Sequence, residues 1–435
     1  MKIEKPASNN TTCIYAFSEL ALKEWNGSIK NATPCCNMIS SINKDPMKIK
    51  DNLENRELTI DEIFNHKSFQ NLRKQMLKGE KPKACQSCFK SEELYNTSYR
   101  LNSTGYIDAL GEIEYNNPSI QILDLSTGDS CNLRCRMCHP GISNQLRIDS
   151  KIFNKNGFDY SKNQPGWWNN NEFLENNSEN KSYFSPGLDS AQWQDLKTHL
   201  KTVKIIKASG GETLMSRSFI DFLDYAIKHD FSKNIELHIH TNGTKFNTPM
   251  LKRFEKFKSV SPDFSIDGVN KIFEYIRYPA KFNEVEQNLY NFFNSDVYTN
   301  HFQVNFVLMS YNIHSIEDTI NWALNFGKLT NKFVKLSIDL INPLGRNIDI
   351  KWLPPEIISK IINNLKQYKN YNNSYCNIKV EKALNYMKEC VKNYSPNEEM
   401  LRRFKEETVQ FDLARNQSYR DYCHPEIVEL LDSIK

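Results

Sequence analysis

The sequence reads Gln121-Ile122-Leu123-Asp124-Leu125 and, a few residues later, Cys131-Asn132-Leu133-Arg134-Cys135-Arg136-Met137-Cys138. The first stretch is short and mostly apolar, which is typical of a buried β-strand. The three cysteines then lie on the loop that follows this strand. In an α/β barrel, such a loop belongs to the C-terminal face, where reactive centres are built.

Five further apolar runs follow this first strand, with helix-length segments between them. The candidate strands are 120–125, 203–208, 235–240, 263–266, 302–309 and 334–341, and amphipathic stretches such as 219–228, 284–293 and 315–326 lie between several of them. Alternation of buried strands with helices favours parallel βα units. We therefore predict an α/β fold whose core is a partial (β/α)6, TIM-like barrel, with a doubly wound open sheet as the alternative.

The chain divides into three predicted segments. Residues 1–115 are rich in cysteine and have little strand character, residues 116–350 hold the barrel, and residues 351–435 are predicted to form a helical extension. A long insert at about 150–190 contains Trp167-Trp168 and is far longer than an ordinary βα loop. A lid over the site and a surface loop without a role are both open interpretations of it.

Composition excludes several classes of protein. The chain has 435 residues and a formal charge of only +4, which does not favour broad binding to nucleic acid. There is no 18-residue apolar run, so no membrane span is expected, and no secretory signal is visible at the N-terminus. We expect a cytoplasmic protein, in which the eleven cysteines serve as metal ligands more readily than as disulfides.

Three cysteine thiolates suit one task particularly well. A cubane iron–sulfur cluster has four irons, so three ligands leave one iron open, much as a catalytic zinc keeps a free position. An open iron can bind a small chelating molecule and pass it an electron. The alternatives are a zinc knuckle with a distant fourth ligand, or three buried structural cysteines.

The spacing C-x3-C-x2-C, with Met137 before the third cysteine, is similar to the motif of radical S-adenosylmethionine (SAM) enzymes. Further family-like motifs follow the successive strands in the family's order. They are Ser209-Gly210-Gly211-Glu212, His240-Thr241-Asn242-Gly243, Ser265-Ile266-Asp267-Gly268, Arg277 and Asn312. The resemblance covers about residues 118–345 and departs at Thr213, where the family usually has proline.

The resemblance implies the roles of these residues. Cys131, Cys135 and Cys138 would bind a [4Fe–4S] cluster, and SAM cleavage there would yield a 5′-deoxyadenosyl radical that abstracts hydrogen from a substrate. The SAM-binding residues would be Met137, Gly210, Gly211, Glu212, Asn242, Ser265, Asp267, Arg277 and Asn312. A flavodoxin or ferredoxin is the implied electron donor. No side chain is identified as the final acid, base or hydrogen donor.

A second set of cysteines lies in the N-terminal segment. Gly27 with Pro34-Cys35-Cys36, and Cys85-Gln86-Ser87-Cys88 followed by Ser98-Tyr99-Arg100, resemble the twitch and SPASM auxiliary-cluster modules of radical SAM enzymes. The implied ligands of a second [4Fe–4S] cluster are Cys13, Cys35, Cys85 and Cys88, with Cys36 as the alternative to Cys35. Structural zinc and unliganded thiols are the competing interpretations. A cluster with four protein ligands would accept an electron rather than bind substrate.

These observations predict a radical SAM oxidoreductase that acts on a peptide or protein side chain. A dehydrogenase or epimerase of a sugar or other small metabolite is the alternative enzyme. A zinc-stabilised scaffold and an iron–sulfur electron carrier are alternatives from other classes. The remaining cysteines, Cys376, Cys390 and Cys423, have no metal-ligand spacing and are expected to be buried small hydrophobes, with hydrogen donation by one thiol as the other option.

Overall fold

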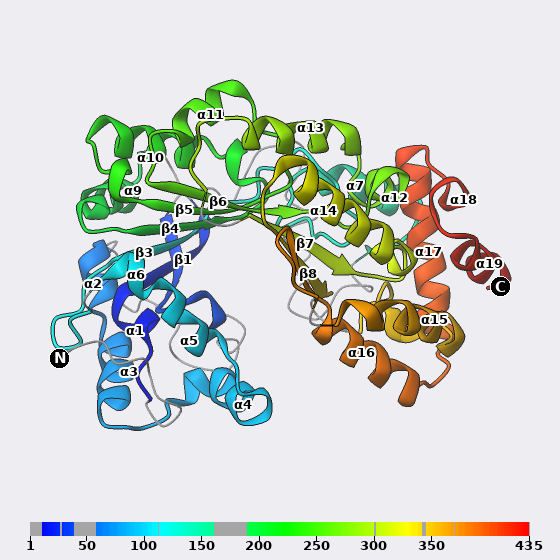
Figure 1. Ribbon diagram of the computed structural model, residues 1–435, viewed down its shortest axis with the longest axis horizontal. Helices are drawn as coiled ribbons and strands as arrows, with labels where there is room; N and C mark the ends of the chain where they lie inside the picture. The colour runs from blue at the N-terminus through cyan, green and yellow to red at the C-terminus, as the bar shows by residue number, and fades with distance from the viewer. Residues whose placement is uncertain are drawn as a thin grey trace. The chain divides into compact units, whose positions relative to one another are not determined.

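The computed structural model describes residues 11–26, 28–38, 58–111, 113–160, 189–299, 302–341, 345–369 and 371–434 (Figure 1). Most of the predicted insert, including Trp167-Trp168, lies outside these residues, as does Gly27. The chain forms two compact units. Unit 1 comprises Met1–Gly128, Ser182–Ile239 and Lys252–Val260, and unit 2 comprises Asp129–Lys181, His240–Leu251 and Ser261–Lys435. The predicted boundaries of the three segments stay predictions.

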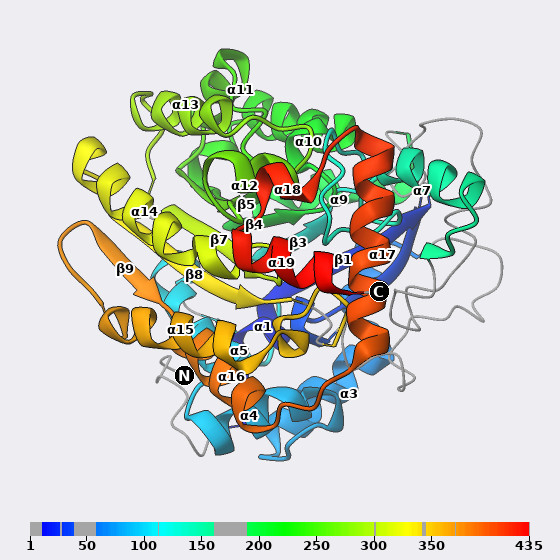
Figure 2. The same ribbon diagram turned by 90° about the vertical axis from the view of Figure 1, so that its right-hand side faces the viewer.

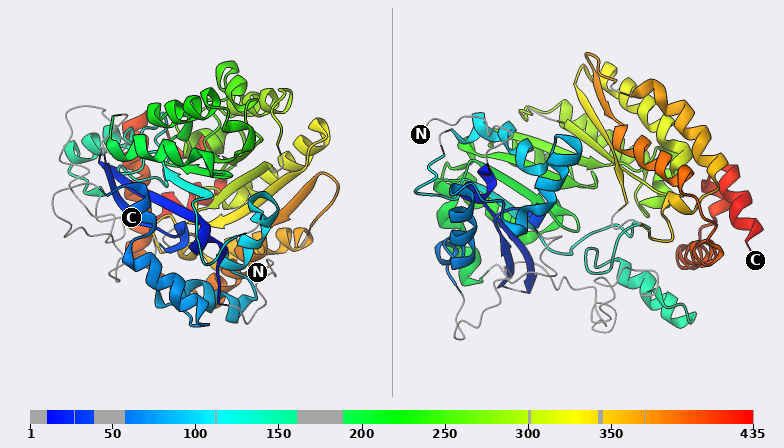
Figure 3. Two further views of the ribbon diagram at one scale, coloured as in Figure 1. Left: turned by 90° about the vertical axis from the view of Figure 1, so that its left-hand side faces the viewer. Right: turned by 90° about the horizontal axis from the view of Figure 1, so that it is seen from below.

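The residues that the structure describes form an α/β fold, in which nine strands make a mostly parallel sheet. In unit 1, neighbouring strands follow the order β2-β1-β3-β4-β5. Their bounds are β1 Glu19–Asn26, β2 Ser28–Thr33, β3 Ile122–Ser126, β4 Ile205–Ser209 and β5 Glu236–Thr241. The β1–β2 hairpin, dark blue in Figure 3, is antiparallel, and the other pairs are parallel. The parallel register sets Asp124 opposite Lys207, and Lys207 opposite His238.

In unit 2, the neighbouring strands follow the order β6-β7-β8-β9 and are parallel. Their bounds are β6 Ser259–Ser265, β7 Phe302–Leu308, β8 Val334–Leu340 and β9 Cys376–Lys379. The strands β5 and β6 each have residues in both units. Residues in β7 and β8 alternate between buried and half-buried, as expected for strands with one face on the core.

The helices flank these strands along the chain. In and near the N-terminal segment they are α1 Ile14–Ser18, α2 Ile60–Phe64, α3 Lys67–Leu77, α4 Gln86–Tyr95, α5 Tyr99–Asn102 and α6 Ile107–Leu110. In the core they are α7 Leu146–Lys155, α9 Ala191–Thr198, α10 Arg217–Lys228, α11 Thr248–Phe254, α12 Asn270–Ile276, α13 Phe282–Phe293 and α14 Ile316–Thr330. The C-terminal helices are α15 Pro355–Leu365, α16 Glu381–Lys392, α17 Glu398–Arg415, α18 Tyr419–Tyr422 and α19 Pro425–Ser433.

The six predicted strands are confirmed as β3 to β8, and the α/β class with a TIM-like core is consistent with this alternation. The largest error in a strand boundary is at β6, which begins at Ser259 rather than at Asp263. Ser259-Val260-Ser261-Pro262 hid this start, because proline and serine are depleted in strands. Residues 60–77 form two helices, because the chain breaks at Asn65-His66 and His66 caps α3.

Two predictions about strands were wrong. The N-terminal segment contains β1 and β2, although it was expected to have little strand character. Leu, Ala, Lys and Glu in β1 favour helix, but pairing with β3 determines the outcome. The C-terminal extension contains β9, whose four residues are too few for a periodic pattern. Among the residues described, none of the helices combines the length and the apolar character that a membrane span requires.

Candidate functional site

The loop with the three cysteines lies in unit 2 and is fixed by backbone hydrogen bonds. The N–H groups of Arg134 and Arg136 donate to the carbonyls of Tyr278 and Ile276, at 2.7 and 2.9 Å. These bonds tie the cysteine loop to the residues at the end of α12. The backbone that carries the three cysteine side chains is therefore fixed in position.

Three donors approach the cysteine sulfurs of this loop. Leu133 N–H lies 3.4 Å from the Sγ of Cys131, and the Asn242 amide lies 4.0 Å from the same sulfur. The Arg277 guanidinium lies 3.9 Å from the Sγ of Cys135. Donors of this kind stabilise thiolates, the form in which cysteine binds metal. The three cysteines and their surroundings therefore fit a metal-bound set of three thiolates.

Burial opposes this charge on the free thiols. It raises the pKa of Cys135, against which the Arg277 cation acts, and it raises the pKa of Cys138 to about 12. Asp267 pairs with Arg277 at 2.7 Å and also accepts a bond from Val307 N–H at 2.7 Å. Burial raises the pKa of Asp267, and the Arg277 cation opposes this shift. The predicted residues Asp267 and Arg277 are thus brought together beside Cys135.

Asn242 and Asn312 hold turns at the ends of β5 and β7. The Asn242 amide donates to Asn132 Oδ1 at 3.0 Å, and its own oxygen accepts from Thr244 N–H and Oγ1. Asn312 donates to two backbone carbonyls, those of Asp267 and Val307, and accepts from Met309 N–H. The observed role of Asn312 is therefore structural, and its predicted contact with the nucleoside stays a prediction.

Ser265 and Met137 are two further residues of unit 2 that were predicted to bind SAM. Ser265 is the last residue of β6 and is half-buried. Met137 is half-buried between Arg136 and Cys138, and its carbonyl accepts a bond from Arg346 at 2.7 Å. The backbone beside Cys138 is thus held from the segment that follows β8.

The loop Ser209-Gly210-Gly211-Glu212 lies in unit 1 and packs tightly on the end of β3. A Cβ on Gly210 would lie 2.5 Å from Thr127 Oγ1 and 2.8 Å from the Gly128 carbonyl, so this position needs glycine. Gly211 N–H also donates to the Gly128 carbonyl, at 2.8 Å. Glu212 is buried and caps the following turn by accepting from Leu214 N–H. The close contact observed here is with the chain itself, and the predicted contact of this loop with SAM stays a prediction.

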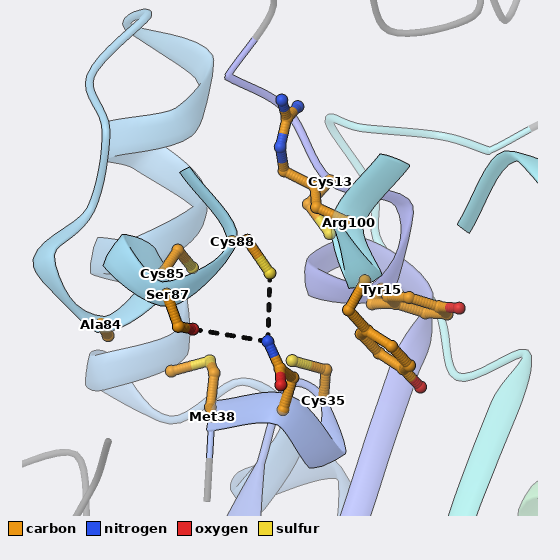
Figure 4. A pocket seen from close by; sticks show the side chains of 11 residues that line it. Cys13, Tyr15, Cys35, Met38, Ala84, Cys85, Ser87, Cys88 and Arg100 are labelled. Carbon is orange, nitrogen blue, oxygen red and sulfur yellow. Dashed lines mark hydrogen bonds between the residues drawn. The ribbon is translucent and has the colours of Figure 1, made fainter. Parts of the chain in front are cut away.

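Four cysteines of unit 1 line one small pocket. Figure 4 shows the side chains of Cys13, Cys35, Cys85 and Cys88 around this space. Cys13 caps α1, Cys35 precedes the short helix Cys36–Met38, Cys85 precedes α4 and Cys88 lies in α4. The sequence predicted these four residues as one ligand set, and the structure brings all four together.

Burial disfavours the charged form of three thiols in this four-cysteine pocket. It raises the pKa of Cys13 and of Cys85 to about 12, and that of Cys35 well above its ordinary value. The Asn37 amide donates to Cys88 Sγ at 3.1 Å and to Ser87 Oγ at 3.4 Å. Four sulfurs around one small cavity are the donor set of a closed iron–sulfur cluster or a structural zinc.

Cys36 is not among the residues that line this pocket. Its thiol instead donates to the Tyr99 hydroxyl at 3.1 Å, and Lys207 donates to the same oxygen at 3.1 Å. Lys207 also pairs with the buried Glu19 at 2.7 Å, and burial raises the pKa of Glu19 to about 7. Cys36 therefore belongs to a buried charged network, which also contains an ion pair between Lys23 and Asp124.

Sequence reasoning missed this network. Charged residues within otherwise apolar strands, such as Asp124 in β3 and Lys207 in β4, were the available signal. Cys376, Cys390 and Cys423 are buried, as expected of small hydrophobes, and all eleven cysteines are free of disulfides.

Residues 125–323 match the model of the radical SAM superfamily. A comparison with curated proteins gives no match.

Among solved structures, the chain is similar to anSMEcpe with bound AdoMet, at 18% identity and a TM-score of 0.34, over 57% of this chain and 60% of that chain. It is similar to SuiB of Streptococcus suis bound to S-adenosylmethionine, at 13% identity and 0.38, over 75% and 67%. It is also similar to SuiB bound to the precursor peptide SuiA, at 10% and 0.37, over 78% and 59%. The chain spans about 60% of the length of the first of these structures.

Proposed function

We propose, from the match of residues 125–323 to the radical SAM superfamily model, that the protein is an oxidoreductase with two iron–sulfur clusters. The catalytic [4Fe–4S] cluster would be held by Cys131, Cys135 and Cys138. When bound, it supplies the electron that cleaves SAM to methionine and a 5′-deoxyadenosyl radical. The single observation that carries this proposal is the three-cysteine loop inside the matched domain, with donors directed at its sulfurs.

The chain's own residues would bind and orient SAM. Arg277 offers a guanidinium suited to a carboxylate, and Asp267 fixes its position through their ion pair. The backbone of Gly210 and Gly211 is fixed against Thr127 and Gly128, which supports a preorganised loop. The other proposed SAM-binding residues are Met137, Glu212, Asn242, Ser265 and Asn312.

The second cluster would be held by Cys13, Cys35, Cys85 and Cys88, as in a twitch-like module. Their convergence on one cavity supports this assignment, and the position of Cys36 in the charged network favours Cys35 over Cys36 as the ligand. With four protein ligands no iron is left for substrate, so the second cluster would take part in electron transfer. This favours a net oxidation of the substrate.

The substrate we propose is a peptide or protein side chain. SuiB, one of the similar proteins, was solved with a precursor peptide. A sugar or other small metabolite is the second candidate. The electron donor would be a flavodoxin or ferredoxin, and the free cysteines favour a reducing compartment such as the cytoplasm.

Anaerobic reconstitution followed by metal analysis tests the proposal. We expect about eight irons per chain, a broad visible charge-transfer band, and 5′-deoxyadenosine from SAM under reductant. One or two zincs in a colourless protein would show a scaffold instead. Bound clusters without 5′-deoxyadenosine formation would indicate an iron–sulfur electron carrier.

A further inference from the structure

Arg136 lies between two of the three cysteines and points into the protein rather than toward solvent. Its side chain is fully buried, and its guanidinium lies 3.6 Å from the ring centroid of Tyr275. The charge is matched by Asp412, on α17, at 2.5 Å, while the Nε–H donates to the Tyr275 carbonyl at 3.0 Å. A buried charge needs such a partner, because removal from water is costly. The cysteine loop is therefore bound to the C-terminal extension.

Arg134, directly before Cys135, is bound to the same helix through Asp149 of α7. Asp149 accepts from Arg134 at 2.7 Å and from Arg415 of α17 at 2.8 Å. Arg415 also donates directly to the carbonyl of Arg134. The residues on both sides of Cys135 thus have partners in the last turn of α17.

An apolar contact joins these elements beside the third cysteine. Phe411 of α17 packs with Phe153 of α7 and with Tyr160, and Cys138 packs against this cluster. The Tyr160 hydroxyl donates to the Cys138 carbonyl at 3.4 Å. Figure 2 shows α17, in orange-red, beside α7.

The last turn of α17 buries two charged side chains, Asp412 and Arg415, where a helix that only closes a core would bury apolar ones. The Asp412 carboxylate accepts three hydrogen bonds. One oxygen accepts from Arg136 and from Tyr275 Oη, and the other accepts from Tyr419 N–H. At the other end of the helix, Glu399 forms exposed pairs with Arg402 and Arg403. Apolar side chains would fill a core as well as a buried ion pair does, so the pair is better explained by the position that it specifies.

We propose that the last turn of α17 is a positioning element for the three-cysteine loop, in which Asp412 and Arg415 are positioning residues that fix Cys135 and Cys138. A cluster with three protein ligands has one ligand fewer to order its loop. The extension supplies the missing order from outside the matched domain. This inference rests on the proposed function, because it assigns residues to the same cluster.

The test uses the full-length, reconstituted protein without substrate. Asp412→Asn keeps the shape of the side chain and removes the charge that pairs with Arg136, whereas Asp412→Glu keeps the charge. Glu399→Gln on the exposed start of α17 is the matched control. The measurements are iron per chain, the EPR spectrum of the reduced catalytic cluster with and without SAM, and the rate of 5′-deoxyadenosine formation.

For Asp412→Asn we expect about a tenfold loss of 5′-deoxyadenosine formation and loss of most of the SAM-dependent EPR change. The iron of the four-cysteine pocket should remain, which shows that the chain has folded. Asp412→Glu should recover part of the rate, and Glu399→Gln should match the unmodified protein.

Asp412→Asn protein with an unchanged spectrum and rate would overturn the positioning role. Equal iron loss from both sites would also contradict it, because that result indicates general unfolding. If the unmodified protein and Glu399→Gln both form no 5′-deoxyadenosine, the proposed function fails instead. The two failures are therefore distinguishable.

Discussion

The two cysteine sites of this protein are ordered in different ways. The three-cysteine loop has its proposed ligands within eight consecutive residues, and ion pairs of Arg134 and Arg136 anchor it. The proposed ligands of the four-cysteine pocket are spread from Cys13 to Cys88, and aromatic side chains such as the stacked pair Tyr15 and Tyr99 also line this pocket. The three-cysteine loop is short, and charged residues from outside it hold it in place. The four cysteines of the pocket come from several elements, which pack together in one core.

The electrostatic surroundings of the two sites also differ. At the loop, the Arg277 cation lowers the pKa of Cys135 against the effect of burial. At the pocket, burial raises the pKa of Cys35, and Glu19 and the neighbouring thiols raise it further. Arg100 lowers the pKa of Cys13 and of Cys85 against burial, as Arg277 does for Cys135, so the difference between the two sites lies at Cys35, beside an acidic residue. Cys35 is therefore the pocket thiol whose charged form depends most on a bound cation.

The largest effect is expected from Cys135→Ala. The loop would keep two thiolates, too few for the catalytic cluster, so 5′-deoxyadenosine formation should fall by about three orders of magnitude or more. About four irons should remain in the four-cysteine pocket. Iron analysis and product assay check this result. If Cys135→Ala protein cleaves SAM at the original rate, the three-cysteine loop does not hold the catalytic cluster.

Exchange of the pocket ligands should give the opposite pattern. Cys35→Ala should lose the iron of the pocket, about four per chain, and keep 5′-deoxyadenosine formation without substrate within about twofold. Cys36→Ala is the matched control, because the Cys36 thiol donates a hydrogen bond to the Tyr99 hydroxyl and Cys36 does not line the pocket. Its iron content should be unchanged. The reverse result, with iron lost only in Cys36→Ala, would assign the ligand to Cys36.

The sequence predicted the six core strands because buried parallel strands appear as continuous apolar runs. It also predicted the three-cysteine loop, because its three cysteines lie close together in the sequence. It could not separate Cys35 from Cys36, because adjacent residues face different surroundings that only tertiary packing defines. The partners of Arg136 and Arg134 were equally hidden, since Asp412 and Arg415 lie more than 270 residues along the chain. Long-range ion pairs leave no local pattern in a sequence.

Removal of the cation beside Cys135 should affect the loop and spare the pocket. Arg277→Met leaves the buried Asp267 without its counterion, which should destabilise the metal-free protein by about 3 kcal/mol. The potential of the catalytic cluster should fall, because a donor to its sulfur is lost, while the pocket's potential stays constant. Chemical denaturation and EPR-monitored titration measure these effects. Equal shifts at both clusters would contradict a local role for Arg277.

The smallest expected effect is on pH dependence, and it distinguishes the metal-free pocket from the loaded one. In the metal-free fold, burial raises the pKa of Cys13 to about 12, whereas an unfolded cysteine titrates at about 8.5–9. Between these values the folded state holds a proton that the unfolded state has lost, so stability falls as pH rises. The contribution of Cys13 is fully present below about pH 8 and should fall by about 1.5 kcal/mol between pH 8 and pH 10.

Urea denaturation of the metal-free protein at these two pH values measures the fall. Cys13→Ser is the control, because serine does not titrate in this range, and its loss of stability should be smaller by about 1.5 kcal/mol. In the loaded protein the thiol is already deprotonated on the metal, so the contribution of Cys13 should not depend on pH. An equal fall in the metal-free unmodified and Cys13→Ser proteins would mean that Cys13 is not the buried neutral thiol of this pocket.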